Sequence, residues 1–167
     1  MRRIHIILFA ILGTFFLFSC EEEMTGPELS NNPEGPALQN PTAGTSFKLP
    51  EAMSDDTLTT FEWNAADFGV STATTYTLQV DTASSFPNAV ELGKTNKTSL
   101  GVLVSDLNSK LTSQLGVDDS TQTYDVHFRL RAVVNADVDT LYSEVLTLSI
   151  TPYIVVIEYP EIYVAGG

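Results

Sequence analysis

The segment "YDVHFRLRA" at residues 124–132 constrains the fold most strongly, because apolar and polar residues alternate along it without interruption. Successive side chains of a β-strand point to opposite faces, so this alternation predicts a strand with one buried face and one exposed face. The segments "TYTLQVD" at 75–81 and "LTLSIT" at 146–151 repeat the pattern. The residues expected to face inward are Tyr76, Leu78, Val80, Tyr124, Val126, Phe128, Leu130, Ala132, Leu146, Leu148 and Ile150.

Four further segments are weaker strand candidates: "SFKL" at 46–49, "TTFEW" at 59–63, "AVELGKT" at 89–95 and "SLGVLV" at 99–104. Seven short strands with turn residues between them predict an all-β fold, a β-sandwich. The stretch from residue 40 to residue 153 has the length of one such domain, and the chain contains no internal repeat.

One short helix is expected between the predicted strands. Ser105 is the candidate N-cap, Leu107, Leu111 and Leu115 recur every fourth residue, and Gly116 can end the helix in a left-handed conformation. A helix of about ten residues is marginal alone, so its leucine stripe should pack against the sheets.

The chain begins with Arg2 and Arg3, followed by an apolar stretch over residues 4–18. As a helix these fifteen residues would span about 22 Å, less than a hydrocarbon core of about 30 Å. A basic start, a short apolar run and a small residue at Ser19 predict a secretory signal peptide over residues 1–19. A membrane-spanning anchor is the alternative.

Cys20 is the only cysteine, so an intramolecular disulfide cannot form. The sequence "LFSC" at 17–20 resembles the lipobox of bacterial lipoproteins, in which the cysteine is acylated and becomes the new N-terminus. Each buried methylene contributes about 0.8 kcal/mol, so two or more acyl chains would hold a protein stably on a membrane. The alternative is a free thiol within or beside a signal peptide.

Glu21, Glu22 and Glu23 follow the cysteine directly. Acidic residues at this place resemble the surface-export signal of some Gram-negative lipoproteins, and the alternative is the start of a solvated linker. Residues 20–39 are rich in proline and glycine and poor in large apolar residues, which predicts a flexible tether.

Removal of residues 1–19 would leave six Lys and Arg against 21 Asp and Glu, a formal charge of −15. Such a surface repels phosphate backbones and anionic head groups, which argues against nucleic-acid binding. Neutral sugars, calcium and protein partners remain compatible with this charge.

Candidate catalytic residues are few. His127, the only histidine after the leader, falls on the polar face of its strand and is expected to face solvent. The carboxylate pairs Asp55–Asp56, Asp118–Asp119 and Asp137 with Asp139 fall in predicted turns, where Asp bonds its own backbone, although calcium could bridge such a pair. No phosphate-binding glycine loop or zinc-ligand spacing occurs, so we expect no catalytic residue, no cofactor and no metal.

Exposed aromatic rings are the usual platforms for sugars, but the strand pattern places Trp63, the only tryptophan, inward beside Phe61. Tyr142 and Tyr153 are looser candidates for exposed rings. The sequence therefore names no ligand-binding site.

Several motifs stand together in the predicted sandwich: Pro41, Gly44, Phe47, Leu49, Phe61, Trp63, Ala66, Asp67, Phe68, Gly69 and the closing Thr151-Pro152-Tyr153. Together they resemble the N-terminal domain of SusE-like outer-membrane lipoproteins of starch-utilisation systems. The resemblance implies an immunoglobulin or fibronectin-III type sandwich that acts as a non-catalytic, membrane-proximal spacer. It also implies a lipid anchor, a neighbouring SusC/SusD-like transporter complex, and starch or another glycan bound by later modules.

The segment "YIVVIEYPEIYV" at residues 153–164 is apolar, prone to form β-strands and low in charge, and "PEIYVAGG" resembles the opening of a following glycan-binding module. Residues 154–167 are therefore predicted to be a linker or the first strand of that module. An unpaired strand of this kind would expose an aggregation-prone edge. We therefore expect either a missing module after this first strand or an extra edge strand. Two other functions remain open, an accessory module of a truncated glycoside hydrolase and a surface adhesion or protein-interaction module.

Overall fold

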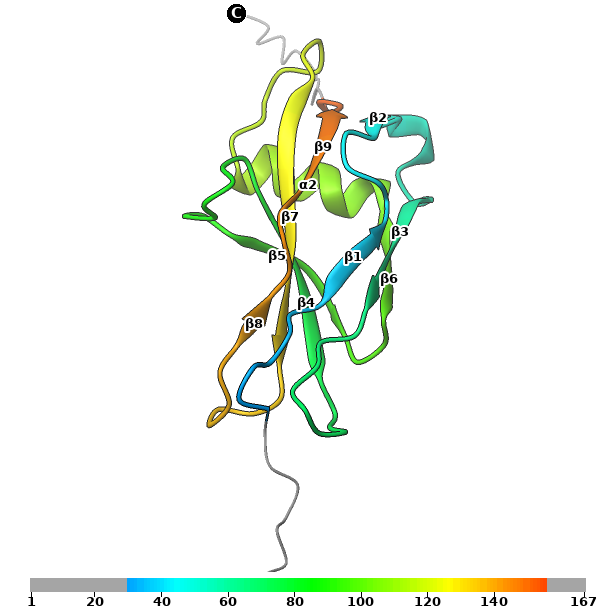
Figure 1. Ribbon diagram of the computed structural model, residues 1–167. Helices are drawn as coiled ribbons and strands as arrows, with labels where there is room; N and C mark the ends of the chain where they lie inside the picture. The colour runs from blue at the N-terminus through cyan, green and yellow to red at the C-terminus, as the bar shows by residue number, and fades with distance from the viewer. Residues whose placement is uncertain (1–29, 156–167) are drawn as a thin grey trace, which may run out of the picture.

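A computed structural model describes residues 30–155, which form two β-sheets packed face to face with one α-helix beside them (Figure 1). The smaller sheet has the order β1-β3-β6, and the larger sheet has the order β2-β9-β7-β4-β5, with β8 paired to β7. This arrangement confirms the predicted all-β, immunoglobulin-like sandwich. The elements are β1 (Ala37–Asn40), β2 (Ser46–Lys48), the 3₁₀ turn η1 (Glu51–Met53), β3 (Thr57–Asn64), β4 (Thr75–Asp81), β5 (Val90–Thr95), β6 (Ser99–Leu103), α2 (Val104–Gln114), β7 (Tyr124–Val133), β8 (Leu141–Tyr142) and β9 (Leu146–Thr151).

Strand β7 lies at the centre of the larger sheet and pairs antiparallel with β4, β8 and β9. Its inward side chains alternate with outward ones as the sequence predicts, and four of them are fully buried: Val126, Phe128, Leu130 and Ala132. Strands β4 and β9 have the predicted bounds, and their inward residues join the same core.

The first part of the sandwich divides between the two sheets. Strand β1 pairs antiparallel with β3, and after Pro41 the chain crosses to the other sheet, where β2 pairs parallel with β9. The packed structure begins earlier than the sequence boundary at residue 40, because β1 includes three residues of the predicted tether and Glu34 already bridges Asp67. Strand β1 reads "ALQN", and these four residues are too few and too polar for an alternation of apolar and polar side chains to predict a strand.

Helix α2 follows β6 without a loop and begins at Val104, so the prediction of Ser105 as its N-cap is wrong. Within residues 30–155 no side chain caps this helix. Backbone carbonyls of the turn that follows η1 accept from its first two free N–H groups instead. The Val104 amide donates to the Asp56 carbonyl at 3.0 Å, and the Ser105 amide donates to the Ser54 carbonyl at 2.9 Å. At the other end Gly116 takes the predicted left-handed conformation, with φ of +69°.

The core lies between the two sheets and under α2. Leu107 and Leu111 of the predicted leucine stripe are buried, and Leu115 packs partly buried against the same cluster. Phe61 stacks on Phe128 with ring centroids 5.2 Å apart. Trp63 is buried, as the sequence predicts, and meets Tyr76 edge to face at 5.5 Å.

Trp63 fills volume without a hydrogen bond, because its buried Nε1 has no acceptor within residues 30–155. We therefore expect Trp63→Ala to lower the free energy of unfolding by about 3–5 kcal/mol, since it removes a large buried ring. Trp63→Phe keeps most of the ring and sacrifices no hydrogen bond, so its cost should be about 1–2 kcal/mol. Urea unfolding followed by circular dichroism measures both; equal costs for the two variants would contradict this account.

Candidate functional site

The two ends of the described chain lie at opposite poles of the sandwich. Figure 1 shows the chain joining the domain at one pole, beside the loops near β8, and leaving it beyond β9 at the other. Each pole holds the passing chain by hydrogen bonds to a loop or helix. These two attachments are the clearest candidate functional features of the described residues, and we call them the N-terminal clamp and the C-terminal clamp.

The N-terminal clamp consists of Ser30 and Glu34 against Asp67, Phe68 and Gly69. The Ser30 amide donates to the Phe68 carbonyl at 2.8 Å, and Glu34 and Asp67 exchange two backbone hydrogen bonds at 2.8 and 2.9 Å. Gly69 has φ of +80°, and a Cβ there would lie 2.6 Å from Ser30, so only glycine lets the two segments approach this closely. The "ADFG" motif of the sequence therefore builds the attachment of the incoming chain.

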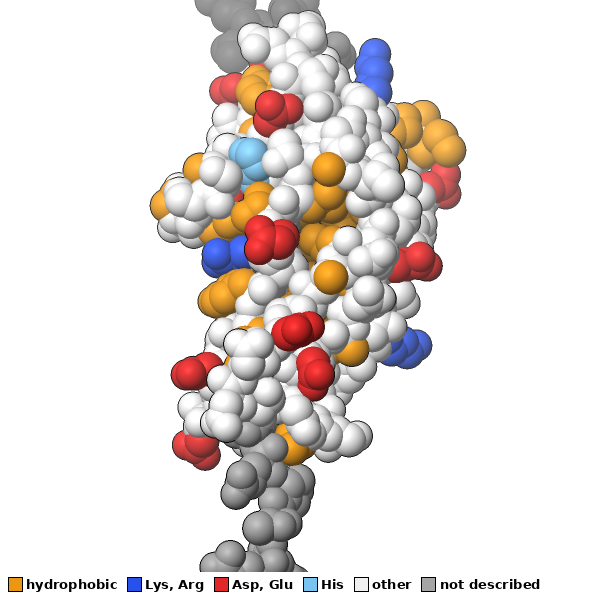
Figure 2. Space-filling model, viewed as in Figure 1, with side chains coloured by type: hydrophobic (Ala, Val, Ile, Leu, Met, Phe, Trp, Pro, Cys, Tyr) orange, Lys and Arg blue, Asp and Glu red, His pale blue; other side chains and the backbone are white. Residues whose placement is uncertain are grey.

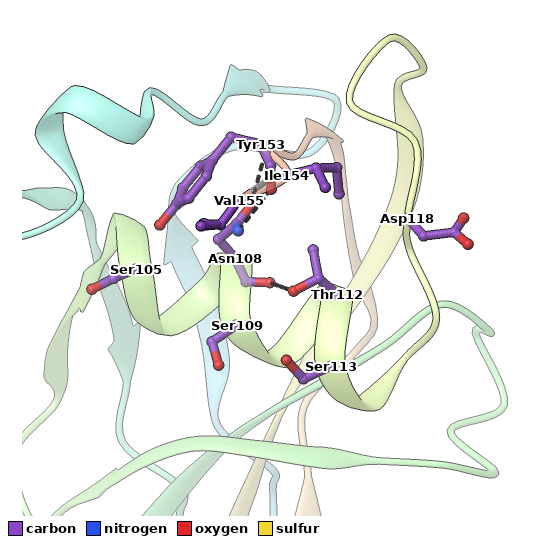
Figure 3. A pocket seen from close by; sticks show the side chains of 9 residues that line it. All are labelled: Ser105, Asn108, Ser109, Thr112, Ser113, Asp118, Tyr153, Ile154 and Val155. Carbon is purple, nitrogen blue, oxygen red and sulfur yellow. Dashed lines mark hydrogen bonds between the residues drawn. The ribbon is translucent and has the colours of Figure 1, made fainter. Parts of the chain in front are cut away.

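The C-terminal clamp consists of Asn108 on α2 and the backbone of Tyr153. The Asn108 side-chain amide donates to the Tyr153 carbonyl at 2.9 Å, and its oxygen accepts from the Tyr153 amide at 2.9 Å (Figure 3). Asn108 is only 4% exposed, so these bonds lie away from competing water. The side chain thus binds the outgoing backbone as a neighbouring strand would.

A groove of about 490 Å³ runs beside the C-terminal clamp. Hydroxyl side chains of α2 line it, together with the outgoing residues, and Figure 3 shows Asp118 directed away from it. An acyl-transfer or glycosidase site needs a base beside a nucleophile or two acids across a cleft. The lining of this groove supplies neither arrangement: Ser105, Asn108, Ser109, Thr112, Ser113, Asp118, Tyr153, Ile154 and Val155.

Among the histidine and carboxylates considered from the sequence, His127 and Asp119 have hydrogen-bond partners close by. His127 is half-buried, and its Nδ1 lies 2.9 Å from the Thr147 hydroxyl. Asp119 accepts hydrogen bonds from the Thr121 hydroxyl, the Thr121 amide and the Gln122 side chain, and these hold its pKa below the ordinary value. Within residues 30–155, no group of three His, Cys, Asp or Glu side chains could hold a metal ion.

The lipidation candidate Cys20 and the acidic residues Glu21, Glu22 and Glu23 lie outside the described residues, as does most of segment 154–167. Their assignments stay predictions. In the part of the chain that the structure describes, no helix is long and apolar enough to cross a membrane.

One arrangement was not predicted from the sequence. The Arg129 guanidinium lies over two aromatic rings, 4.2 Å from the centroid of Phe86 and 4.4 Å from that of Tyr142. Its Nε also donates to the Gln79 side chain at 2.9 Å. Tyr142, one of the two looser aromatic candidates, is 45% exposed, whereas Tyr153 is half-buried against the core. The strand alternation places Arg129 on the outer face but gives no sign of the two rings, because Phe86 lies in the loop after β4 and Tyr142 in strand β8.

The family comparison agrees with the sequence motifs. A family model described as SusE outer membrane protein matches residues 22–131, two thirds of the chain. The chain belongs to the SusE outer membrane protein family. The match includes the N-terminal clamp, helix α2 and most of β7, which confirms the predicted SusE-like resemblance and an outer-membrane association. No curated protein and no solved structure matches this SusE-family chain.

The C-terminal clamp can be tested by Asn108→Ala, which removes two hydrogen bonds with a net contribution of about 1 kcal/mol each. We expect the free energy of unfolding to fall by about 2 kcal/mol and the Tyr153 amide to exchange its hydrogen faster. Ser109→Ala is the matched control, because Ser109 is an exposed neighbour on the same helix. Unchanged exchange at Tyr153 in the Asn108 variant would show that the clamp does not hold the outgoing chain.

Proposed function

We propose that this chain is a non-catalytic, lipid-anchored lipoprotein on the cell surface, in which the sandwich is a spacer between the membrane and glycan-binding modules. The observation that carries the proposal is the position of the two clamps at opposite poles of the sandwich. A domain that receives the chain at one pole and releases it at the other adds its whole length to the separation of the flanking segments. Membership of the SusE family supports the outer-membrane setting.

The proposed anchor is Cys20, acylated after removal of residues 1–19, and Glu21–Glu23 are the proposed surface-export signal. Acyl chains on one sulfur and one amino group would bury enough methylenes to hold the protein stably on a membrane. The remaining chain would then lie next to a SusC/SusD-like transporter complex, and starch or another glycan would bind modules beyond this sandwich.

The architecture of the described residues favours a spacer over the accessory module of a truncated glycoside hydrolase or an adhesion module. A spacer requires fixed attachments at both poles, and the N-terminal clamp even includes a position that only glycine can occupy. Nothing in the other two functions requires the incoming and outgoing chain to be held at opposite poles. The coding region beyond Gly167 would separate the three functions, because a hydrolase adds a domain with paired acids whereas a spacer precedes aromatic-rich β-modules.

The anchor predicts that Cys20→Ala releases the protein from the outer-membrane fraction, because no acyl chain can then attach. A matched variant with Glu21, Glu22 and Glu23 replaced by glutamine keeps the thiol, and it should stay membrane-bound but lose accessibility to external protease. Cell fractionation and protease shaving of intact cells measure the two effects. Retention of the Cys20 variant in membranes would contradict the anchor.

The spacer role predicts that the 167-residue chain does not bind starch measurably, because its only tryptophan is buried and the glycan modules would follow this domain. Electrophoresis through a gel that contains amylopectin tests this directly, with a starch-binding protein as the positive control. Retardation of the chain relative to a gel without amylopectin would mean that the sandwich itself binds glycan.

A further inference from the structure

The outer face of the larger sheet concentrates positive charge on an otherwise acidic chain. Three of the six Lys and Arg residues after Ser19 lie there, in two adjacent rows. In one row Lys94, Thr77, Arg131 and Tyr142 lie side by side across four strands. The neighbouring row holds Glu91, Gln79 and Arg129. We call these seven residues the basic face.

The arginines of the basic face have no carboxylate partner among residues 30–155. The only ion pair of these residues joins Lys94 to Glu91 at 2.8 Å, so none of their carboxylates lies within salt-bridge distance of Arg129 or Arg131. The Arg131 guanidinium also makes no hydrogen bond to this part of the chain. Figure 2 shows a blue basic patch at one margin of the view, below the pale blue histidine and close to a red acidic side chain, with further red side chains over the face turned toward the viewer. On a chain with 21 acidic residues, two half-buried arginines that have no carboxylate partner within residues 30–155 are a candidate cationic site.

Contacts within the domain hold the side chain of Arg129 in one conformation. The guanidinium carbon lies over the rings of Phe86 and Tyr142, and its Nε donates to Gln79, so the two terminal nitrogens make no hydrogen bond within residues 30–155. Such an arginine loses little side-chain entropy on binding, and its terminal N–H groups match a carboxylate in two-point contact.

The loop that carries Phe86 is itself held in place by a buried carboxylate. Asp81 is 0% exposed, and it accepts hydrogen bonds from the Ala83 amide at 3.1 Å and the Asn88 amide at 2.8 Å. Phe86 has φ of 56°, a conformation that costs a residue with a side chain about 1 kcal/mol or more. The surrounding loop therefore maintains an unfavourable conformation that places an aromatic ring on Arg129.

We propose that the basic face is a docking surface for another protein, one that presents an acidic segment in an extended conformation. Arg129 and Arg131 are alternate residues of one strand and so lie about 7 Å apart, the spacing of alternate carboxylates along an extended chain. Arginine and tyrosine on a flat sheet are typical of protein interfaces, whereas a glycan chain is usually bound in a concave site. The formal net charge of −13 opposes contact between two whole copies of the chain more strongly than contact with one acidic segment of another protein. The attraction for that segment is the short-range contact of its carboxylates with the two arginines.

The test is binding of a fluorescein-labelled Glu-Ser-Glu-Ser-Glu-Ser-Glu peptide to the purified full chain, measured by fluorescence anisotropy at 50 mM and 300 mM salt. We expect saturable binding that weakens at the higher salt concentration and that is lost when the peptide carries Gln in place of Glu. Arg131→Gln should weaken binding about fivefold, and Arg129→Gln with Arg131→Gln at least about tenfold. Arg129→Lys keeps the charge but loses the contact of the planar guanidinium with the rings of Phe86 and Tyr142, so this variant should bind the peptide with intermediate affinity.

Lys110→Gln is the matched control, because it removes the same charge from α2, away from the basic face. It should bind the peptide as the unaltered chain does, and thermal melts should show that Arg131→Gln folds normally. The proposal is overturned if no saturable binding occurs at 50 mM salt, or if the Lys110 variant loses as much affinity as the Arg131 variant. It is also overturned if sedimentation equilibrium at 50 mM salt shows a dimer that Arg131→Gln abolishes, because the occupant would then be a second copy.

Discussion

The alternation of side chains along β7 is the constraint on which the rest of the structure depends. Its inward residues form the centre of the core between the two sheets, and its backbone pairs with β4, β8 and β9. A shift of one residue would turn every side chain to the opposite face, so burial of the inward set fixes the register of the whole larger sheet. The same register places Arg129 and Arg131 outward in neighbouring rows. The core and the basic face are therefore two results of one pattern.

Prediction from the sequence succeeded where burial is strong and periodic. Strands β4 and β9, the buried Trp63 and the leucine stripe of α2 all follow from patterns that only a half-buried strand or helix produces. The prediction of the helix N-cap was wrong, because backbone groups make the hydrogen bonds that a capping side chain would make. The sequence predicts Ser105 as the N-cap of α2 because serine is a common cap. In the structure, carbonyls from a turn about fifty residues earlier in the chain accept the hydrogen bonds from the first amides of the helix.

The candidate site was predicted less well than the fold, for a related reason. The motif at residues 66–69 was recognised as a family feature, yet its contact with Ser30 depends on where a distant segment lies. In the sequence Asn108 resembles any other polar residue of a helix, because its partner is the distant backbone of Tyr153. The aromatic neighbours of Arg129 are equally hidden, since Phe86 comes from the loop after β4 and Tyr142 from strand β8. Each of these contacts joins residues that lie far apart along the chain, so no local sequence pattern predicts it.

The parallel pairing of β2 with β9 has a mechanical consequence. Strand β2 lies near the start of the domain and β9 at its end, and their ladder is extended by hydrogen bonds from Gly44 to Thr147, from Ser149 to Thr45 and from Leu49 to Thr151 at 2.9–3.0 Å. Tension between the two ends of the chain would slide these strands past one another and load the bonds of the ladder together, instead of opening them one by one. The domain would therefore resist extension when a force pulls its two ends apart.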